Sequence, residues 1–242
     1  MAARQRRGGR HLAPWPGGAF AGGSPGAAGA RTHGLRLAKR GAGGADKLAP
    51  GARMLRPNWF FAFPMDGAFL RELPEPPSAF RRFHEEDVHL TLAFLGGVGE
   101  AAAERSLAAL DERLASMPVP SIDVSLGEVV PMGSRSRYTA LSALLARGRP
   151  EATACITALR DLLTETANGR REQRAAKPHV TLARPRHRAT DADREAGLLW
   201  AAQLDVGAVH ATLDRIALYT WSEPRRGRLF EIVAERHLRD QH

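Results

Sequence analysis

Apolar and polar residues alternate along two stretches of the chain that are nearly copies of each other. Residues 88–96 read Val-His-Leu-Thr-Leu-Ala-Phe-Leu-Gly, and residues 178–184 read Pro-His-Val-Thr-Leu-Ala-Arg. Because successive side chains of an extended chain point to opposite faces, each stretch predicts a strand with one apolar and one polar face. The predicted polar faces carry His89, Thr91 and Ala93 in the first strand, and His179, Thr181 and Ala183 in the second. The predicted apolar faces carry Leu90, Leu92 and Phe94, and Val180 and Leu182.

The rest of the pattern predicts helices that alternate with strands. Leu107, Leu110 and Leu114 recur at three- and four-residue spacing, which predicts an amphipathic helix over residues 100–117. Further helices are predicted over 151–168 and 189–203, with a short one that Asp66 begins and the prolines at 74, 76 and 77 end. Further strands are predicted over 57–63, 122–130, 138–145, 211–221 and 227–235. The two motif strands hold comparable positions in two similar series of elements, which suggests pseudo-twofold symmetry.

The first 53 residues have the composition of an unstructured extension. They hold 13 of the 24 glycines and ten basic residues against the single acid Asp46, with few apolar anchors. Such a segment cannot bury enough apolar surface to offset the entropy of ordering it, so we predict disorder over 1–53 and one domain over 54–242. Two other interpretations stay open: an organelle transit peptide, or a true start at Met54.

The formal net charge of +9 belongs to this extension, because the remaining residues carry equal numbers of basic and acidic side chains. A neutral body favours a small ligand or an RNA end over a long nucleic acid. Cys155 is the only cysteine, which excludes an intrachain disulfide, and its helical context suits a small buried residue. No run of about 18 apolar residues is present, so no membrane partner is predicted. The sequence shows no export signal, so we expect a cytoplasmic location, and we expect a monomer.

A single His–Thr pair on a strand is weak evidence for a site, because a histidine in a strand is more often a hydrogen-bonded structural residue. The repetition changes this interpretation. A polar pair on each of two apolar strands costs burial free energy twice, unless both polar faces line a wet cleft. In such a cleft, two imidazoles can act as an acid and a base.

The two His-x-Thr motifs, each followed by Leu-Ala in an apolar strand, resemble those of the two-histidine phosphoesterase superfamily. Within it, the chain is similar to the RNA 2′,3′-cyclic phosphodiesterases, also called 2′-5′ RNA ligase-like proteins, over about residues 54–239. The resemblance implies an α+β fold with two pseudo-symmetric lobes, whose antiparallel sheets line a central cleft with the helices outside. The chain departs from the family in a shorter connection over 66–87 and in Phe230, which stands where the family's Gly-x-x-Tyr has its tyrosine.

The resemblance also implies roles for the motif residues. His89 would donate a proton and His179 would accept one, while Thr91 and Thr181 would bind the phosphate. An imidazole with a pKa near 6.5 can hold either form at neutral pH, which suits both roles. The family needs no metal and no nucleotide cofactor, and its partners are RNA ends or small cyclic nucleotides and oligonucleotides. A zinc site would need a third protein ligand, which the sequence does not supply near either motif.

Other polar and aromatic residues have simpler interpretations. Four further histidines (84, 187, 210 and 237) are expected at the surface. Glu85, Glu86 and Asp87 are expected in a solvated connection, although a carboxylate there could orient a histidine. Phe63 or Phe94 could stack on a base, but both are expected in the core, as is usual for an aromatic residue in a strand. Arginines cluster in loops or at strand ends, where they could reach phosphate but are expected to be solvated: 135 and 137, 184 and 186, and 225, 226 and 228.

These residues support hydrolysis of RNA 2′,3′-cyclic phosphate ends to 2′-phosphates as the leading function. Three alternatives stay open: 2′-5′ ligation of RNA ends, phosphodiesterase action on a small cyclic or 2′-5′-linked nucleotide, and a non-catalytic RNA-end-binding module. Two intact motifs argue against the last, since binding alone would not require an imidazole and a hydroxyl on both strands.

Overall fold

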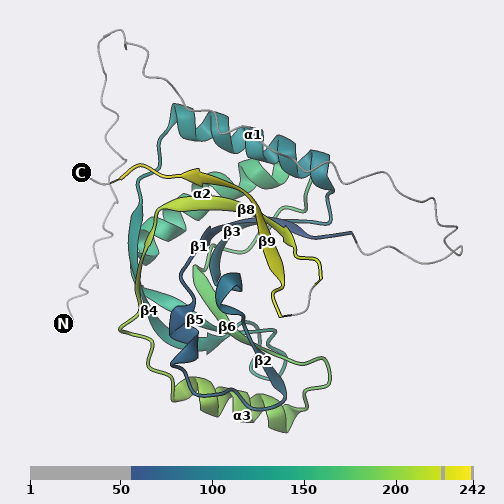
Figure 1. Ribbon diagram of the computed structural model, residues 1–242, viewed down its shortest axis with the longest axis vertical. Coiled ribbons are helices and arrows are strands. Elements are labelled where there is room, and N and C mark those ends of the chain that lie inside the picture. Colours follow the sequence, from purple (N-terminus) through teal and green to yellow (C-terminus); the bar gives the residue numbers. More distant parts are fainter. Residues whose placement is uncertain (1–55, 225–226, 241–242) are drawn as a thin grey trace, which may run out of the picture. The chain divides into compact units, whose positions relative to one another are not determined.

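The computed structural model describes residues 56–224 and 227–240 (Figure 1). The chain divides into two units, 1–50 and 51–242, and every described residue belongs to the second. The extension predicted over 1–53 and the loop arginines 225 and 226 lie outside the described residues.

One antiparallel sheet of nine strands forms the framework of the described region, in the order β7-β4-β5-β6-β3-β1-β8-β9, with β2 paired to β6. The motif strands β3 and β6 are neighbours at its centre, and each has three more strands outside it. The pseudo-symmetric α+β fold is therefore confirmed, with its two halves joined in one sheet. The strands are β1 (Trp59–Pro64), β2 (Phe80–Arg82), β3 (His89–Gly96), β4 (Ile122–Pro131), β5 (Leu141–Arg147), β6 (His179–Pro185), β7 (His210–Leu213), β8 (Arg215–Trp221) and β9 (Phe230–His237).

The α-helices lie outside this curved sheet (Figure 1). The α-helices are α1 (Glu100–Ser116), α2 (Arg149–Thr166) and α3 (Asp191–Ala202), and two short 3-10 helices are η1 (Ala68–Arg71) and η2 (Glu85–Asp87). Helix α2 packs against α1 and β3, and the buried hydroxyl of Ser106 in α1 donates to the carbonyl of Leu163 in α2 (2.7 Å). Helix α3 packs against β4 and β5 and begins with a Thr190–Asp193 capping box.

The sequence missed two features that depend on pairing. The predicted strand over 211–221 is two strands separated by Asp214, because β7 pairs with β4 while β8 pairs with β1 and β9. Strand β2 was not predicted, since its three residues carry no periodicity of their own. Phe63 and Cys155 are buried as expected, and no helix among the described residues is long and apolar enough to span a membrane.

Candidate active site

The two motifs meet at one cross-strand pair, Leu90 and Val180, which joins β3 to β6 in antiparallel register. One residue further along each strand, this register sets His89 opposite Thr181 and His179 opposite Thr91. The four residues that the sequence singled out therefore lie around a single point, related by a pseudo-twofold axis. This is the pair recorded between β3 and β6 in the described residues, and further along the same edge β6 pairs with β2 from Ala183 to Pro185.

A β-bulge follows the threonine of the first motif. Thr91 pairs with Ala62 and Ala93 pairs with Phe61, so Leu92 is an extra residue in β3. A bulge places two residues of one strand opposite one of its partner and shifts the alternation of side chains that follows. Ala93 is consequently buried, and Phe94 turns to the histidine face, where it is 57% exposed. The expectation that Ala93 lies on the polar face and Phe94 in the core was wrong for this reason.

The second motif contains the same bulge. Thr181 pairs with Ser142 and Ala183 pairs with Leu141, which makes Leu182 the extra residue in β6. Ala183 is fully buried instead of sharing the face of His179. Arg184 then takes the position that Phe94 holds in β3, five residues after the histidine.

Arg184 acts on both histidines. Its guanidinium lies over the Phe83 ring (5.1 Å to the centroid), and its positive charge lowers the pKa of His89 and of His179. Arg184 also pairs across the strands with Arg81 of β2, and two like charges placed directly opposite each other are destabilising. This cost is consistent with an anion-binding role for Arg184 and Arg81. From the sequence alone, Arg184 is expected to be solvated.

Each imidazole is oriented by a backbone carbonyl two residues earlier. The Nδ1 atom of His89 lies 2.6 Å from the carbonyl oxygen of Asp87, and that of His179 lies 2.6 Å from the carbonyl oxygen of Lys177. A carbonyl can only accept, so each Nδ1 carries a proton and donates it. In the neutral rings Nε2 then keeps its lone pair, which is the atom that can exchange protons with a substrate.

Aromatic rings surround His89. The ring centroids of Phe60, Tyr219 and Phe230 lie 5.0, 5.4 and 5.7 Å from that of His89. Burial lowers the pKa of His89 to about 4, with smaller contributions from the charges of Arg184 and His179. Burial also lowers the pKa of His179, helped by the charges of Lys177 and Arg184. Both shifts favour the neutral form of the imidazole near pH 7.

Residues 70–225 match the family model of the 2′-5′ RNA ligase superfamily. The chain belongs to this superfamily of two-histidine phosphoesterases. The fold agrees with solved structures: Escherichia coli LigT in complex with 3′-AMP (21% identity, 75% of this chain and 98% of LigT covered, TM-score 0.55) and TT0787 of Thermus thermophilus (17%, 76% and 100%, TM-score 0.59). None of the curated proteins compared with the chain shows significant sequence similarity to it.

Ser142 contacts the threonine of the second motif in this member of the 2′-5′ RNA ligase superfamily. The sequence pattern does not single this serine out. Its hydroxyl is buried and lies 3.4 Å from that of Thr181, close enough to donate a weak hydrogen bond. The Thr181 proton then stays available for a ligand. Ser142 lies in β5, which reads Leu-Ser-Ala-Leu-Leu-Ala-Arg and has no strict alternation, so only the pairing with Thr181 reveals its place.

Asp87 corrects a prediction made for the connection before the first motif. Glu86 is exposed as expected, but Asp87 is fully buried. Its carboxylate accepts from the backbone amides of Leu229 (2.8 and 3.0 Å) and Phe230 (3.0 Å). The carbonyl of Asp87, not its carboxylate, orients His89. A sequence run of three acids gave no sign that the third would face inward.

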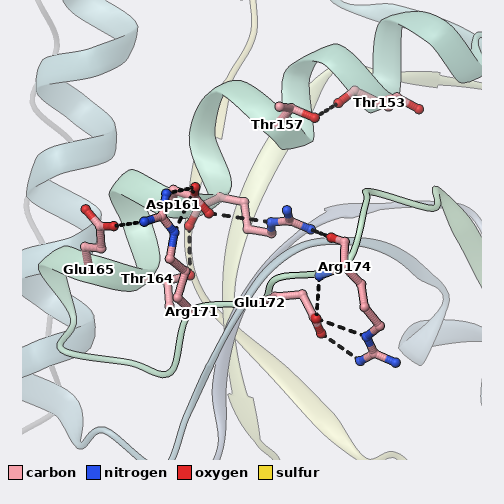
Figure 2. A network of polar contacts seen from close by, with 9 residues as sticks. Thr153, Thr157, Asp161, Thr164, Glu165, Arg171, Glu172 and Arg174 are labelled. Carbon is pink, nitrogen blue, oxygen red and sulfur yellow. Dashed lines mark hydrogen bonds and ion pairs between the residues drawn. The ribbon is translucent and has the colours of Figure 1, made fainter.

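The connection that leads into His179 is held by ion pairs with α2 (Figure 2). Arg171 bridges Asp161 and Glu165 of the helix. Arg160 of α2 donates to the backbone carbonyl of Arg174 (3.0 Å), which itself pairs with Glu172. These contacts fix residues 171–174 just before Lys177, whose carbonyl orients the second imidazole.

The other candidates have structural or surface roles. His84 caps η2 by accepting from the amide of Glu86 (3.3 Å), Arg135 pairs with Glu195, and Arg228 pairs with Glu86. The histidines at 187, 210 and 237 are exposed. Within residues 56–224 and 227–240, no three His, Cys, Asp or Glu side chains lie together as a metal site would require.

Proposed function

We propose that this protein hydrolyses RNA 2′,3′-cyclic phosphate ends to 2′-phosphates by acid–base catalysis at His89 and His179. The observation that carries the proposal is the shared orientation of the two rings. Each donates Nδ1–H to a carbonyl and leaves Nε2 free, and the two rings flank one cross-strand pair of β3 and β6. This arrangement suits a base on one side of a phosphorus atom and an acid on the other.

The reaction follows from these positions. Nε2 of His179 accepts a proton from water as the water oxygen forms a bond to phosphorus. The bond from phosphorus to the ribose 3′-oxygen breaks, and His89 protonates that oxygen. The product is a 2′-phosphate with a free 3′-hydroxyl. Proton exchange with solvent then restores a protonated His89 and a neutral His179.

The donor role of His89 requires a substrate-linked change of its pKa. The free ring has a pKa of about 4 and carries no Nε2 proton to give at pH 7. A cyclic phosphate is an anion, and an anion next to an imidazole favours the charged form and raises its pKa. We therefore include substrate-induced protonation of His89 in the proposal.

The phosphate would be held by hydroxyls and by positive charge. Thr91 and Thr181 lie across from the two histidines and can donate to the nonbridging oxygens. Arg184, whose charge reaches both imidazoles, would neutralise the charge that develops on these oxygens. Crystal structures of LigT with 3′-AMP and with NADP+ support a nucleotide ligand for a protein of this fold.

Phe94 would bind a nucleobase. It shares the histidine face of β3 because of the bulge at Leu92, and an aromatic side chain that is 57% exposed on that face offers a stacking surface. A base next to the reacting phosphate is a property of RNA ends and of cyclic nucleotides. This feature supports nucleotide substrates over simple phosphodiesters.

The decisive experiment incubates the full chain with a 2′,3′-cyclic-phosphate-terminated oligonucleotide in the presence of a chelator. Phosphorus NMR against 2′- and 3′-phosphate standards identifies the product. We expect a 2′-phosphate, and a loss of turnover of roughly 10²-fold or more in folded His89→Ala and His179→Ala variants. Near-parental turnover by either folded variant would refute the two-histidine mechanism.

The same site could use an alcohol in place of water, which gives 2′-5′ ligation with the same bond broken. Adding an RNA with a free 5′-hydroxyl tests this alternative, because ligation yields a longer product. A panel of small cyclic and 2′-5′-linked nucleotides tests the third possible activity. Tight binding of every substrate without turnover would favour the RNA-end-binding module instead.

A further inference from the structure

Asp87 holds the ring of His89 and the strand that covers this ring. Its carbonyl accepts from His89 Nδ1 (2.6 Å), and its carboxylate accepts from the amides of Leu229 and Phe230 at the start of β9. The carboxylate contacts join residues that are 142 and 143 positions apart in the chain. Asp87 thus connects the orientation of the catalytic imidazole to the placement of β9.

The hydrogen bonds of Asp87 to β9 place the side chain of Phe230 against His89. Its ring stands edge-on to His89 (84° between planes) and to Phe60 (81°, centroids 4.9 Å apart). Together with Tyr219, these rings desolvate the imidazole. If β9 moved away, water would reach His89 from this side.

Two exposed contacts also hold the segment before β9 in place, but less firmly. Arg228 pairs with Glu86 (2.9 Å), and Arg81 donates to the carbonyl of Gly227 (2.6 Å). Exposed ion pairs contribute little stability, typically only a small fraction of the free energy of unfolding. The buried carboxylate, with its three amide contacts, is the stronger anchor. Breaking these contacts would leave buried polar groups without partners, which costs more free energy than losing an exposed ion pair.

The second motif lacks such an anchor. Lys177 holds the equivalent position and orients His179 with its carbonyl, but its side chain is not buried. The two halves of the site are therefore alike in how each ring is oriented and different in how each ring is covered. This asymmetry indicates a specific role for Asp87 at the first histidine.

We propose that Asp87 is a positioning residue, which fixes the His89 imidazole through its carbonyl and keeps it covered by Phe230 through its carboxylate. The inference rests on the proposed catalytic role of His89. The ionisable groups that act on the Asp87 carboxylate are His84, Arg184, Tyr219 and Arg228.

The test uses Asp87→Asn in the full chain, with Glu86→Gln as the matched control. Asparagine keeps the shape but presents an NH₂ group to amides that are themselves donors, so β9 should loosen. NMR titration of the His89 ring should then show a pKa raised from about 4 toward the ordinary value, because desolvation is relieved. Turnover should nevertheless fall by about 10- to 100-fold, with a smaller change in KM, because the imidazole is no longer held in its position once β9 loosens. Glu86→Gln, which removes an exposed carboxylate, should leave the pKa and turnover unchanged.

A second variant, Phe230→Ala, keeps the backbone amide and removes the covering ring. It should raise the pKa of His89 in the same way, and it serves if Asp87→Asn does not fold. A folded Asp87→Asn protein with an unchanged His89 pKa and unchanged turnover would overturn the proposal, as would an equal effect of Glu86→Gln. The titration needs no substrate, so failure of the proposed activity would show as absent turnover in the parent while the shift in pKa is still seen.

Discussion

The carbonyl oxygen of Asp87 lies 2.6 Å from Nδ1 of His89, and the carbonyl oxygen of Lys177 stands in the same relation to His179. This relationship sets the tautomer of both neutral rings and leaves the lone pair of each on Nε2. Because the two rings are oriented alike, their different surroundings would decide which acts as the acid and which as the base in the proposed reaction.

The assignment of acid and base can be tested with a cyclic phosphate that has sulfur in place of the 3′-oxygen. A thiolate leaves without protonation, because a thiol has a pKa of about 8.5. We expect the defect of His89→Ala to shrink to less than about 10-fold on this substrate, while the defect of His179→Ala persists. Rescue of His179→Ala instead would assign the acid role to His179.

Arg184→Gln should raise the pKa of both histidines, since the positive charge of Arg184 lowers both. Turnover should fall by roughly 10²-fold if this guanidinium stabilises charge on the phosphate. Ring titration by NMR and steady-state kinetics measure the two effects separately. Arg184→Lys is the control: it keeps the charge, so the pKa values should stay near those of the parent.

Phe94→Ala should weaken oligonucleotide binding and leave the chemical step intact. Loss of a stacking contact worth about 1–3 kcal/mol corresponds to a rise in KM of about 5- to 100-fold. Phe94→Tyr should preserve KM because it keeps the ring. An unchanged KM in Phe94→Ala would show that the exposed ring does not contact the base.

His89 should make stability depend on pH in the mildly acidic range. Its pKa is about 4 in the folded chain and near 6.5 when unfolded, so between these values the unfolded chain binds the additional proton. The contribution is complete above about pH 6.5 and is lost as pH falls toward 4, by at most about 3 kcal/mol. Urea unfolding from about pH 7 to about pH 4.5 should therefore show a smaller loss for His89→Gln than for the parent. Equal losses would contradict the buried neutral ring.

Gly197→Ala should destabilise the fold even though alanine favours helices. A Cβ at this position of α3 would lie 2.3 Å from the Phe80 ring and 2.7 Å from the Tyr138 hydroxyl. Overpacking costs about 1–3 kcal/mol, which exceeds the helix gain of about 1 kcal/mol. Thermal unfolding measures the net effect. Phe80→Leu in the same chain should recover part of the loss, and strict additivity of the two changes would argue against the clash.

The sequence by itself determined much of this protein. The repeat of His-x-Thr-Leu-Ala was sufficient to identify the superfamily and to single out both histidines, and amphipathic spacing located α1 to within one residue of each end. These features depend on neighbours within a few residues, so a local pattern reveals them. The placement of His89 and Thr91 on one face of the strand also follows from local alternation.

Only the tertiary structure decided which further side chains share that face. The Leu-Ala of each motif marks a bulge because β1 and β5 pair with one residue fewer than β3 and β6 supply. Each mismatch is a property of two paired strands that lie far apart in the chain. It places Phe94 instead of Ala93 on the histidine face of β3, and Arg184 instead of Ala183 on that of β6. Asp87 is buried for a similar reason, because its amide partners lie in β9 and at the residue before it. Long-range register and burial, which no local periodicity encodes, completed the site.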